Sequence, residues 1–131
     1  MSPESSPGEK SHPHQPPPGT LLCKVAEISE PGARGLSFGP PRGSFKIFVV
    51  KHQGSIHAYV NRCPHFKVPL NRSPHGFLKY GGFLKKRLAI ECYNHFARFN
   101  IEDGVCFDGV CKGDALETFP IIVKDGSVLA G

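Results

Sequence analysis

The residues best suited to chemistry in this chain are two cysteines and two histidines, arranged as two short pairs. The first pair lies in Cys63-Pro64-His65 and the second in Cys92-Tyr93-Asn94-His95, so each of two tight loops carries one thiol and one imidazole. Both groups are metal ligands, but a common zinc finger pairs Cys with Cys and His with His. The mixed pairing indicates instead an iron–sulfur cluster with one ligand of each type per loop. A single zinc ion held by all four side chains is the alternative.

A single small domain must position these loops, because 131 residues are enough for one core and too few for two ordinary domains. Fifteen Gly, thirteen Pro and ten Phe with no Trp favour a turn-rich protein of short strands. Five cysteines are too few for a disulfide scaffold. The N-terminus has neither a basic region nor an apolar run, so no export signal and no membrane span are expected. We expect a cytoplasmic protein.

The chain divides into a tail and a domain. Residues 1–19 are rich in Pro, Ser and Gly and nearly lack apolar side chains, so we expect a disordered tail. Residues 20–131 are the expected domain. Its predicted strands cover residues 21–28, 45–50, 55–60, 88–92, 98–101, 119–124 and 127–129.

Turn signals separate several of these strands. Gln53-Gly54, Asp103-Gly104 and Asp125-Gly126 are predicted turns, and residues 35–43, which contain two further prolines, are a predicted loop. Alternation in the strand at residues 55–60 places Ile56, Ala58 and Val60 inward and leaves His57 and Tyr59 outward.

The formal charge of +5 is concentrated between the two Cys/His pairs, where no acidic residue occurs from Arg62 to Arg87. The basic residues there are Arg62, Lys67, Arg72, Lys79, Lys85, Lys86 and Arg87. No nucleic-acid-binding motif accompanies them, so we expect no nucleic-acid partner. We hypothesise that they steer an acidic protein partner toward the ligand loops.

Around the four candidate ligands the sequence resembles the Rieske [2Fe-2S] proteins. The segment from Gly54 to His65 resembles the family's hairpin entering its first ligand loop, and residues 92–99 resemble its second loop and the strand after it. Further matches are Leu70, Gly104, Gly109, Leu116, Pro120 and Gly126. The resemblance covers about residues 20–131 and is greatest to small stand-alone bacterial Rieske ferredoxins.

This resemblance implies an all-β fold: an antiparallel β sandwich with a cluster-binding subdomain formed by the two ligand loops. It implies one [2Fe-2S] cluster, with Cys63 and Cys92 on one iron and His65 and His95 on the other. The function implied is one-electron transfer between a flavoprotein reductase and an oxygenase or another acidic redox protein. Because the chain has no length for a mononuclear-iron domain, we expect a carrier and not an enzyme. A redox-sensing or regulatory Rieske subunit is the second reading, and a structural zinc module the third.

Several residues differ from the family's usual pattern. High-potential members carry hydroxyl side chains two and four places after the last ligand and a disulfide between the loops, whereas this chain has Ala97, Phe99 and Asn94 at those places. The resemblance therefore implies a low potential, roughly −150 mV rather than +300 mV. Phe96 replaces a usual Gly, and Tyr93 replaces a usual Pro.

Two further cysteines, Cys106 and Cys111, lie five residues apart. A disulfide or redox pair is conceivable, but in a reducing cytosol two ordinary buried thiols are favoured. We therefore exclude them from the predicted metal site.

Overall fold

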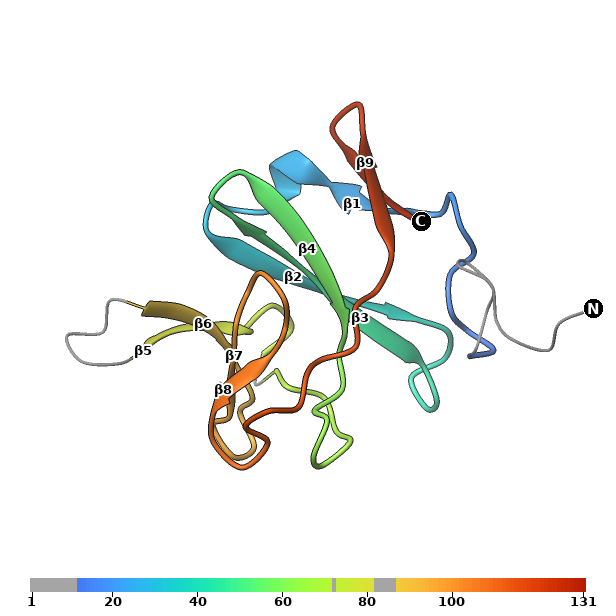
Figure 1. Ribbon diagram of the computed structural model, residues 1–131. Coiled ribbons are helices and arrows are strands. Elements are labelled where there is room, and N and C mark those ends of the chain that lie inside the picture. The colour runs from blue at the N-terminus through green and yellow to red at the C-terminus, as the bar shows by residue number, and fades with distance from the viewer. Residues whose placement is uncertain (1–11, 72, 82–86) are drawn as a thin grey trace, which may run out of the picture.

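The computed structural model describes residues 12–71, 73–81 and 87–131, which form ten strands in three antiparallel sheets (Figure 1). The predicted all-β class is confirmed. The first sheet has the order β1-β10-β9, the second β2-β3-β4 and the third β5-β6-β7-β8. The part of the chain described here contains no helix long and apolar enough to cross a membrane.

The second sheet is the centre of the molecule, and β3 is its middle strand. The strands are β2 (Gly32–Phe38), β3 (Phe45–His52) and β4 (Ser55–Val60). Along β3, Phe45, Ile47 and Val49 enter one hydrophobic core, while Phe48 and Val50 enter another. Successive side chains of a strand point to opposite faces, so the nearly continuous apolar run of β3 serves two cores.

The first sheet covers one face of the central sheet. Its strands are β1 (Leu21–Lys24), β9 (Ile121–Lys124) and β10 (Ser127–Ala130), and a 3₁₀ turn at Val25–Glu27 follows β1. Asp125 and Gly126 both have positive φ, 51° and 75°, in the β9–β10 turn, and Gln53 and Gly54 have 51° and 80° in the β3–β4 turn. Both predicted turns are therefore confirmed as tight hairpins of the kind that matches strand twist.

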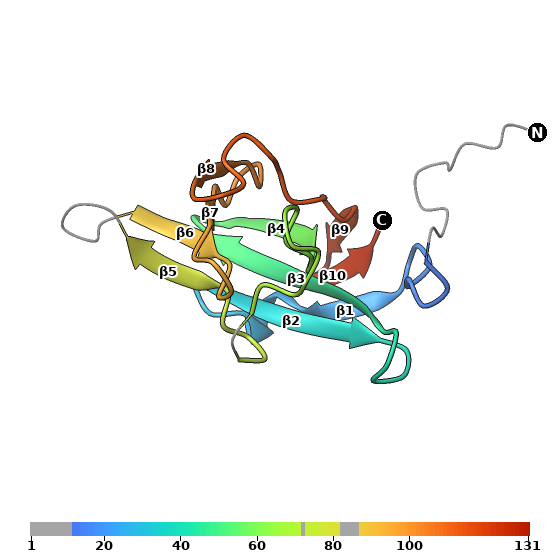
Figure 2. The ribbon, with the colours of Figure 1, turned by 90° about the horizontal axis from the view of Figure 1, so that it is seen from below.

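The third sheet extends from the other core and supports the second ligand loop. Its strands are β5 (Leu78–Gly81), β6 (Arg87–Glu91), β7 (Arg98–Phe99) and β8 (Cys106–Asp108). Figure 2, seen from below, shows β5 and β6 extending to the left of the central strands β2, β3 and β4. The core between them contains both candidate ligand cysteines, with Phe48, Tyr59, Phe77 and Phe99 among its large members.

Several sequence predictions of the fold are wrong. The strand predicted over residues 21–28 ends at Lys24, because Val25–Glu27 form a 3₁₀ turn in which Glu27 Oε1 accepts a hydrogen bond from Lys24 N–H at 2.7 Å. Residues 35–38, predicted as loop, belong to β2, which pairs with β3 along its whole length from Gly32 to Phe38. A Cβ at Gly35 would lie 2.3 Å from the Pro74 carbonyl oxygen, so glycine there admits the loop carrying His75, whose Nδ1 accepts a hydrogen bond from Gly35 N–H at 3.0 Å. Tyr59, predicted to face outward, is buried, because the third sheet and its loops cover the second face of β4.

The end of the predicted tail lies against the domain. Pro16 is buried, the His12 ring lies 5.2 Å from that of Phe45, and Gly19 N–H donates to Ala130 O at 2.7 Å. The tail prediction for residues 1–11 falls outside the described residues.

Candidate metal centre

The first candidate loop follows β4 and is closed by two backbone hydrogen bonds. Cys63 N–H donates to Val68 O at 2.8 Å, and Lys67 N–H donates to Cys63 O at 2.8 Å. Lys67 has φ of 60°, the left-handed conformation that reverses the chain after His65. The loop thus presents the residues between Cys63 and Lys67 at its tip.

The second candidate loop follows β6 and repeats the same hydrogen-bond pattern. Cys92 N–H donates to Ala97 O at 2.9 Å, and Phe96 N–H donates to Cys92 O at 2.7 Å. Phe96 has φ of 58°. Phe96 therefore keeps a positive φ although it replaces the family's usual Gly. In both loops the residue four places after the cysteine has this conformation and donates its N–H to the cysteine carbonyl.

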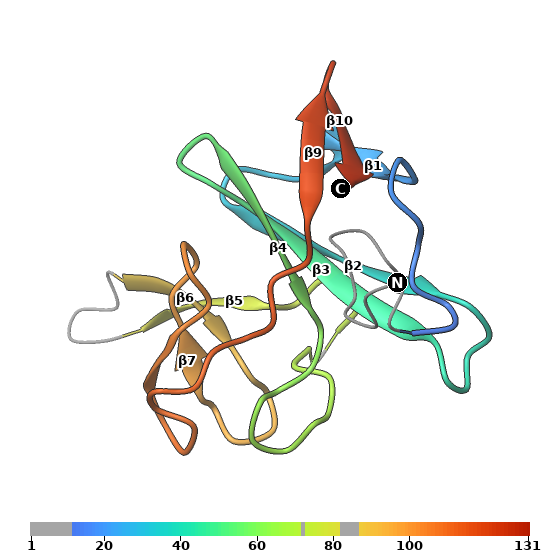
Figure 3. The same ribbon diagram turned by 45° about the vertical axis from the view of Figure 1, so that its right-hand side comes forward.

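Hydrogen bonds join the two loops, which lie side by side in Figures 1 and 3. Tyr93 N–H donates to Leu70 O at 2.8 Å, and Asn94 Nδ2 donates to Pro69 O at 3.1 Å. Buried Asn61 accepts from Leu70 N–H at 2.8 Å and so fixes the end of the first loop. Asn94 stands where high-potential relatives would carry a loop-joining cysteine, and it makes the connection by a hydrogen bond.

The four candidate ligands divide by burial. Cys63 and Cys92 are 1% and 0% exposed, whereas the imidazoles of His65 and His95 are exposed at the loop tips. The ring of Phe66 contacts both, with centroid distances of 4.4 Å to His65 and 3.8 Å to His95. Thiols thus lie inside and imidazoles outside.

The two buried thiols interact with one another. Burial raises the pKa of Cys92, and neighbouring Cys63 raises it further, while backbone hydrogen bonds from Asn94 and His95 lower it. Asn94 Nδ2 also lies 3.9 Å from Cys92 Sγ. The loop therefore supplies donors aimed at a sulfur that would become an anionic ligand.

This donor set fits a [2Fe-2S] group in its chemistry. Each loop has a thiol at its base and an imidazole at its tip. The two loops together thus offer two thiols for one iron and two imidazoles for the other, which is the ligand set of a Rieske cluster. No three ligand side chains among the described residues already surround one point.

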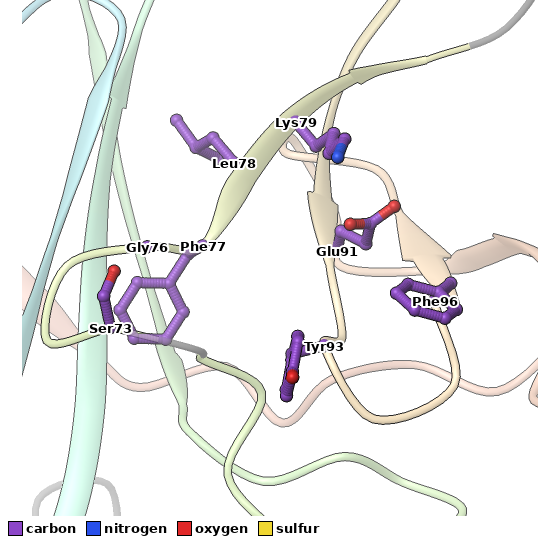
Figure 4. A pocket seen from close by; sticks show the side chains of 8 residues that line it. All are labelled: Ser73, Gly76, Phe77, Leu78, Lys79, Glu91, Tyr93 and Phe96. Carbon is purple, nitrogen blue, oxygen red and sulfur yellow. The ribbon is translucent and has the colours of Figure 1, made fainter.

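A small hollow adjoins the second loop (Figure 4). Tyr93 and Phe96 from the loop line it together with Phe77, Lys79 and Glu91, and its volume is about 160 Å³. Pockets for organic ligands are usually larger, about 300 Å³ or more. The hollow is better suited to a protruding side chain than to a substrate.

The family follows from comparison with known proteins. Residues 20–120 match the family model of the Rieske [2Fe-2S] domain. The chain belongs to the Rieske family. One [2Fe-2S] cluster of the Rieske type is accordingly its cofactor.

The relatives of this Rieske chain include ferredoxins. It is 33% identical over 91 residues to the ferredoxin component of the alkene monooxygenase system of Xanthobacter autotrophicus, covering 68% of this chain and 64% of that protein. The ferredoxin of Sphingomonas yanoikuyae B1 has a TM-score of 0.58 at 21% identity, covering 86% of this chain and 96% of that one. A chain in the complex of reduced oxygenase and oxidised ferredoxin of carbazole 1,9a-dioxygenase has a TM-score of 0.60 at 22% sequence identity. The match covers 85% of this chain and 91% of that one. The two structures share the fold.

Sequence reasoning misses two residues near the candidate ligands, Asn94 and Cys111. Cys111 belongs to the same core as Cys63, and burial, together with Cys106 and Cys63, raises the pKa of Cys111 to about 12. Both Cys106 and Cys111 are buried free thiols. The signal that could have found Asn94 is its place two residues after Cys92, because its side-chain nitrogen lies 3.9 Å from the Cys92 sulfur.

Proposed function

We propose that this chain is a Rieske-type one-electron carrier. The observation that supports it best is the pair of matched loops, with buried Cys63 and Cys92 behind exposed His65 and His95. When bound there, a [2Fe-2S] cluster supplies a centre that gains and loses one electron. With a cluster held by these residues, the buried thiols would face the core and the exposed imidazoles would face a partner.

The proposed ligands are Cys63 and Cys92 for one iron and His65 and His95 for the other. The proposed potential is at the low end of the Rieske range, roughly −150 mV. Ala97 and Phe99 support this value, because neither can donate a hydroxyl hydrogen bond that would stabilise the reduced state.

The proposed partners are an oxygenase, which receives the electron, and a flavoprotein reductase, which supplies it. The relative from an alkene monooxygenase system and the likeness to a ferredoxin complexed with an oxygenase support the first. The reductase and the cytoplasmic location stay predictions from the sequence. The chain spans 64% of the length of its alkene monooxygenase relative, so its particular oxygenase is not inferred from that relative.

The test is an iron and acid-labile sulfide assay on purified protein, with the visible absorption and electron paramagnetic resonance spectra. We expect two irons and two sulfides per chain, a brown colour, and a resonance signal only after reduction. Replacing Cys63, His65, Cys92 or His95 by Ala should abolish the cluster, whereas Cys23→Ala and His57→Ala should retain it. A colourless protein with one zinc ion would establish the structural module instead.

A further inference from the structure

A groove beside the first ligand loop gathers positive charge. The N-terminal segment, the start of β3, the end of β4 and the first ligand loop meet there. Its volume is about 300 Å³, which reaches the size of pockets for small organic ligands. Its cationic residues are Lys46, Arg62 and Lys67, and no carboxylate of a described residue lines it. The groove is therefore suited to an anion.

The three cations of this groove have no acidic partner within the described part of the chain. No ion pair there includes any of them, and Lys46 Nζ donates instead to the hydroxyl of Ser44. Glu117 lines an adjoining hollow of about 230 Å³ together with Arg62 and Lys67, but it forms an ion pair with neither. Like charges around one groove repel one another, so a bound anion would relieve that repulsion.

Hydrogen bonds fix the backbone that carries each cation. Asn61 N–H donates to Lys46 O at 2.9 Å, which joins β3 to the residue before Arg62. Lys67 N–H donates to Cys63 O at 2.8 Å, which closes the loop on the other side. The walls of the groove are thus in place before a ligand arrives, so binding would cost little backbone ordering.

We propose that this groove is a binding site for the phosphoryl group of a small organic molecule. A phosphoryl group carries about two negative charges at pH 7 and three acceptor oxygens, so it can accept from several cations at once, whereas one carboxylate carries a single charge. The guanidinium of Arg62 can donate to two phosphate oxygens together. The rings of His12 and Phe45, 5.2 Å apart, line the same groove and offer a wall for the uncharged part of the ligand. The site uses none of the candidate cluster ligands.

The first test is isothermal titration calorimetry of the purified full chain at physiological salt, with ribose 5-phosphate and unphosphorylated ribose as probes. Ribose 5-phosphate should bind with a dissociation constant of about 1 mM or lower, and ribose should not bind. Arg62→Gln and Lys67→Gln should each weaken binding roughly threefold to tenfold, because each removes one charged donor. Lys124→Gln removes the same charge from an exposed site on the β9–β10 hairpin and should leave the affinity unchanged. The proposal is overturned by a lack of saturable binding, or by an equal loss in Lys124→Gln.

Two further anions separate phosphoryl recognition from attraction to negative charge alone. Succinate, a dicarboxylate, should bind roughly threefold or more weakly than ribose 5-phosphate, because its two charges lie on separate groups. Equal affinity for the two anions would overturn the assignment to a phosphoryl group. A glutamate-rich peptide that binds where ribose 5-phosphate does not would assign the groove to an acidic protein and would also overturn the proposal.

The second test locates the ligand and needs no variant. Acetylation of lysines, followed by mass spectrometry of peptides, should slow at Lys46 and Lys67 in proportion to occupancy by ribose 5-phosphate, but not at Lys112 or Lys124. Unchanged rates at Lys46 and Lys67 would place the ligand elsewhere and overturn the proposal. A protein that holds zinc and still binds ribose 5-phosphate at these lysines would overturn only the proposed function, because the groove contains no candidate cluster ligand.

Discussion

Lys67 and Phe96 share a backbone conformation that glycine adopts most readily, and each lies four residues after a candidate ligand cysteine. For a residue with a Cβ this conformation costs roughly 1 kcal/mol or more. In both loops the strained residue donates its N–H to the cysteine carbonyl, so the loop hydrogen bonds offset the strain. The ring of Phe96 is 59% exposed next to the candidate ligand His95, and it lies 6.5 Å from the ring of Tyr93.

The strain at Phe96 can be measured by comparing two replacements that both remove the ring. We expect Phe96→Gly to be more stable than Phe96→Ala by about 1 kcal/mol, because only Gly occupies positive φ without a Cβ clash. Urea unfolding of the loaded protein measures the difference. Val68, adjacent to Lys67 and without positive φ, is the matched control, and there Ala should be the more stable. The same order at both positions would contradict a left-handed Phe96.

At the scale of elements, Tyr59 on β4 connects the central sheet to the loop after β7 by a hydrogen bond and by the packing of its ring. Its hydroxyl donates to Ile101 O at 2.6 Å, and its ring lies 5.7 Å from that of Phe48. A Cβ at Gly104 would lie 2.7 Å from the Tyr59 ring, so glycine there lets the loop close over it. This one side chain connects the sheet to the segment that follows the second ligand loop.

Burial raises the pKa of Tyr59 to about 12, and the carboxylates of Asp103 and Glu102 contribute. The unfolded value is about 10, so the neutral hydroxyl's contribution is fully present below pH 10 and is lost as pH rises through 12. We expect wild type to lose roughly 2 kcal/mol more than Tyr59→Phe between pH 9 and 12. Urea unfolding across this range measures it. Tyr80→Phe, at an exposed tyrosine, should lose as much as wild type.

The same elements show what could be predicted from the sequence. The β9–β10 hairpin was predictable because Asp and Gly readily adopt the positive φ that a two-residue hairpin turn requires, as Asp125 and Gly126 do here. The β2 strand was not, because its Gly-rich sequence has little strand preference and pairing with β3 imposes the conformation. Alternation showed that His57 and Tyr59 share a face but not that another layer covers it. The position of Cys111 depends on how residues 109–113 fold back, which no local pattern specifies.

At the scale of the whole molecule, positive side chains flank the ligand loops. Lys67 lies within the first loop, and Arg62 precedes it; together with Lys46 they line a groove of about 300 Å³. Lys79 lines the hollow beside the second loop. Arg87, in contrast, lies 3.7 Å over the Phe107 ring and has a structural role there. Arg72, Lys85 and Lys86 of the predicted basic set lie outside the described residues.

This arrangement predicts that the exposed edge attracts negatively charged redox partners. In the loaded, reduced protein, Arg62→Glu with Lys67→Glu should slow oxidation by the anion ferricyanide roughly threefold to tenfold at low salt. Oxidation by the cation hexaammineruthenium(III) should not slow, and high salt should remove the difference. Stopped-flow absorption measures both rates. Lys124→Glu, on the β9–β10 hairpin at the opposite end in Figure 1, should leave both unchanged. Equal slowing of both oxidants would exclude electrostatic steering.

The shared strand β3 has a further consequence for the molecule as a whole. Its side chains enter both cores, so displacement of β3 would disrupt the packing of both cores at once. Unfolding should therefore be a single cooperative transition. A group that binds only the folded ligand loops stabilises every element coupled to them by mass action. Cluster loading at one end of the molecule should thus slow amide hydrogen exchange in the β9–β10 hairpin at the other, wherever that exchange proceeds through global unfolding.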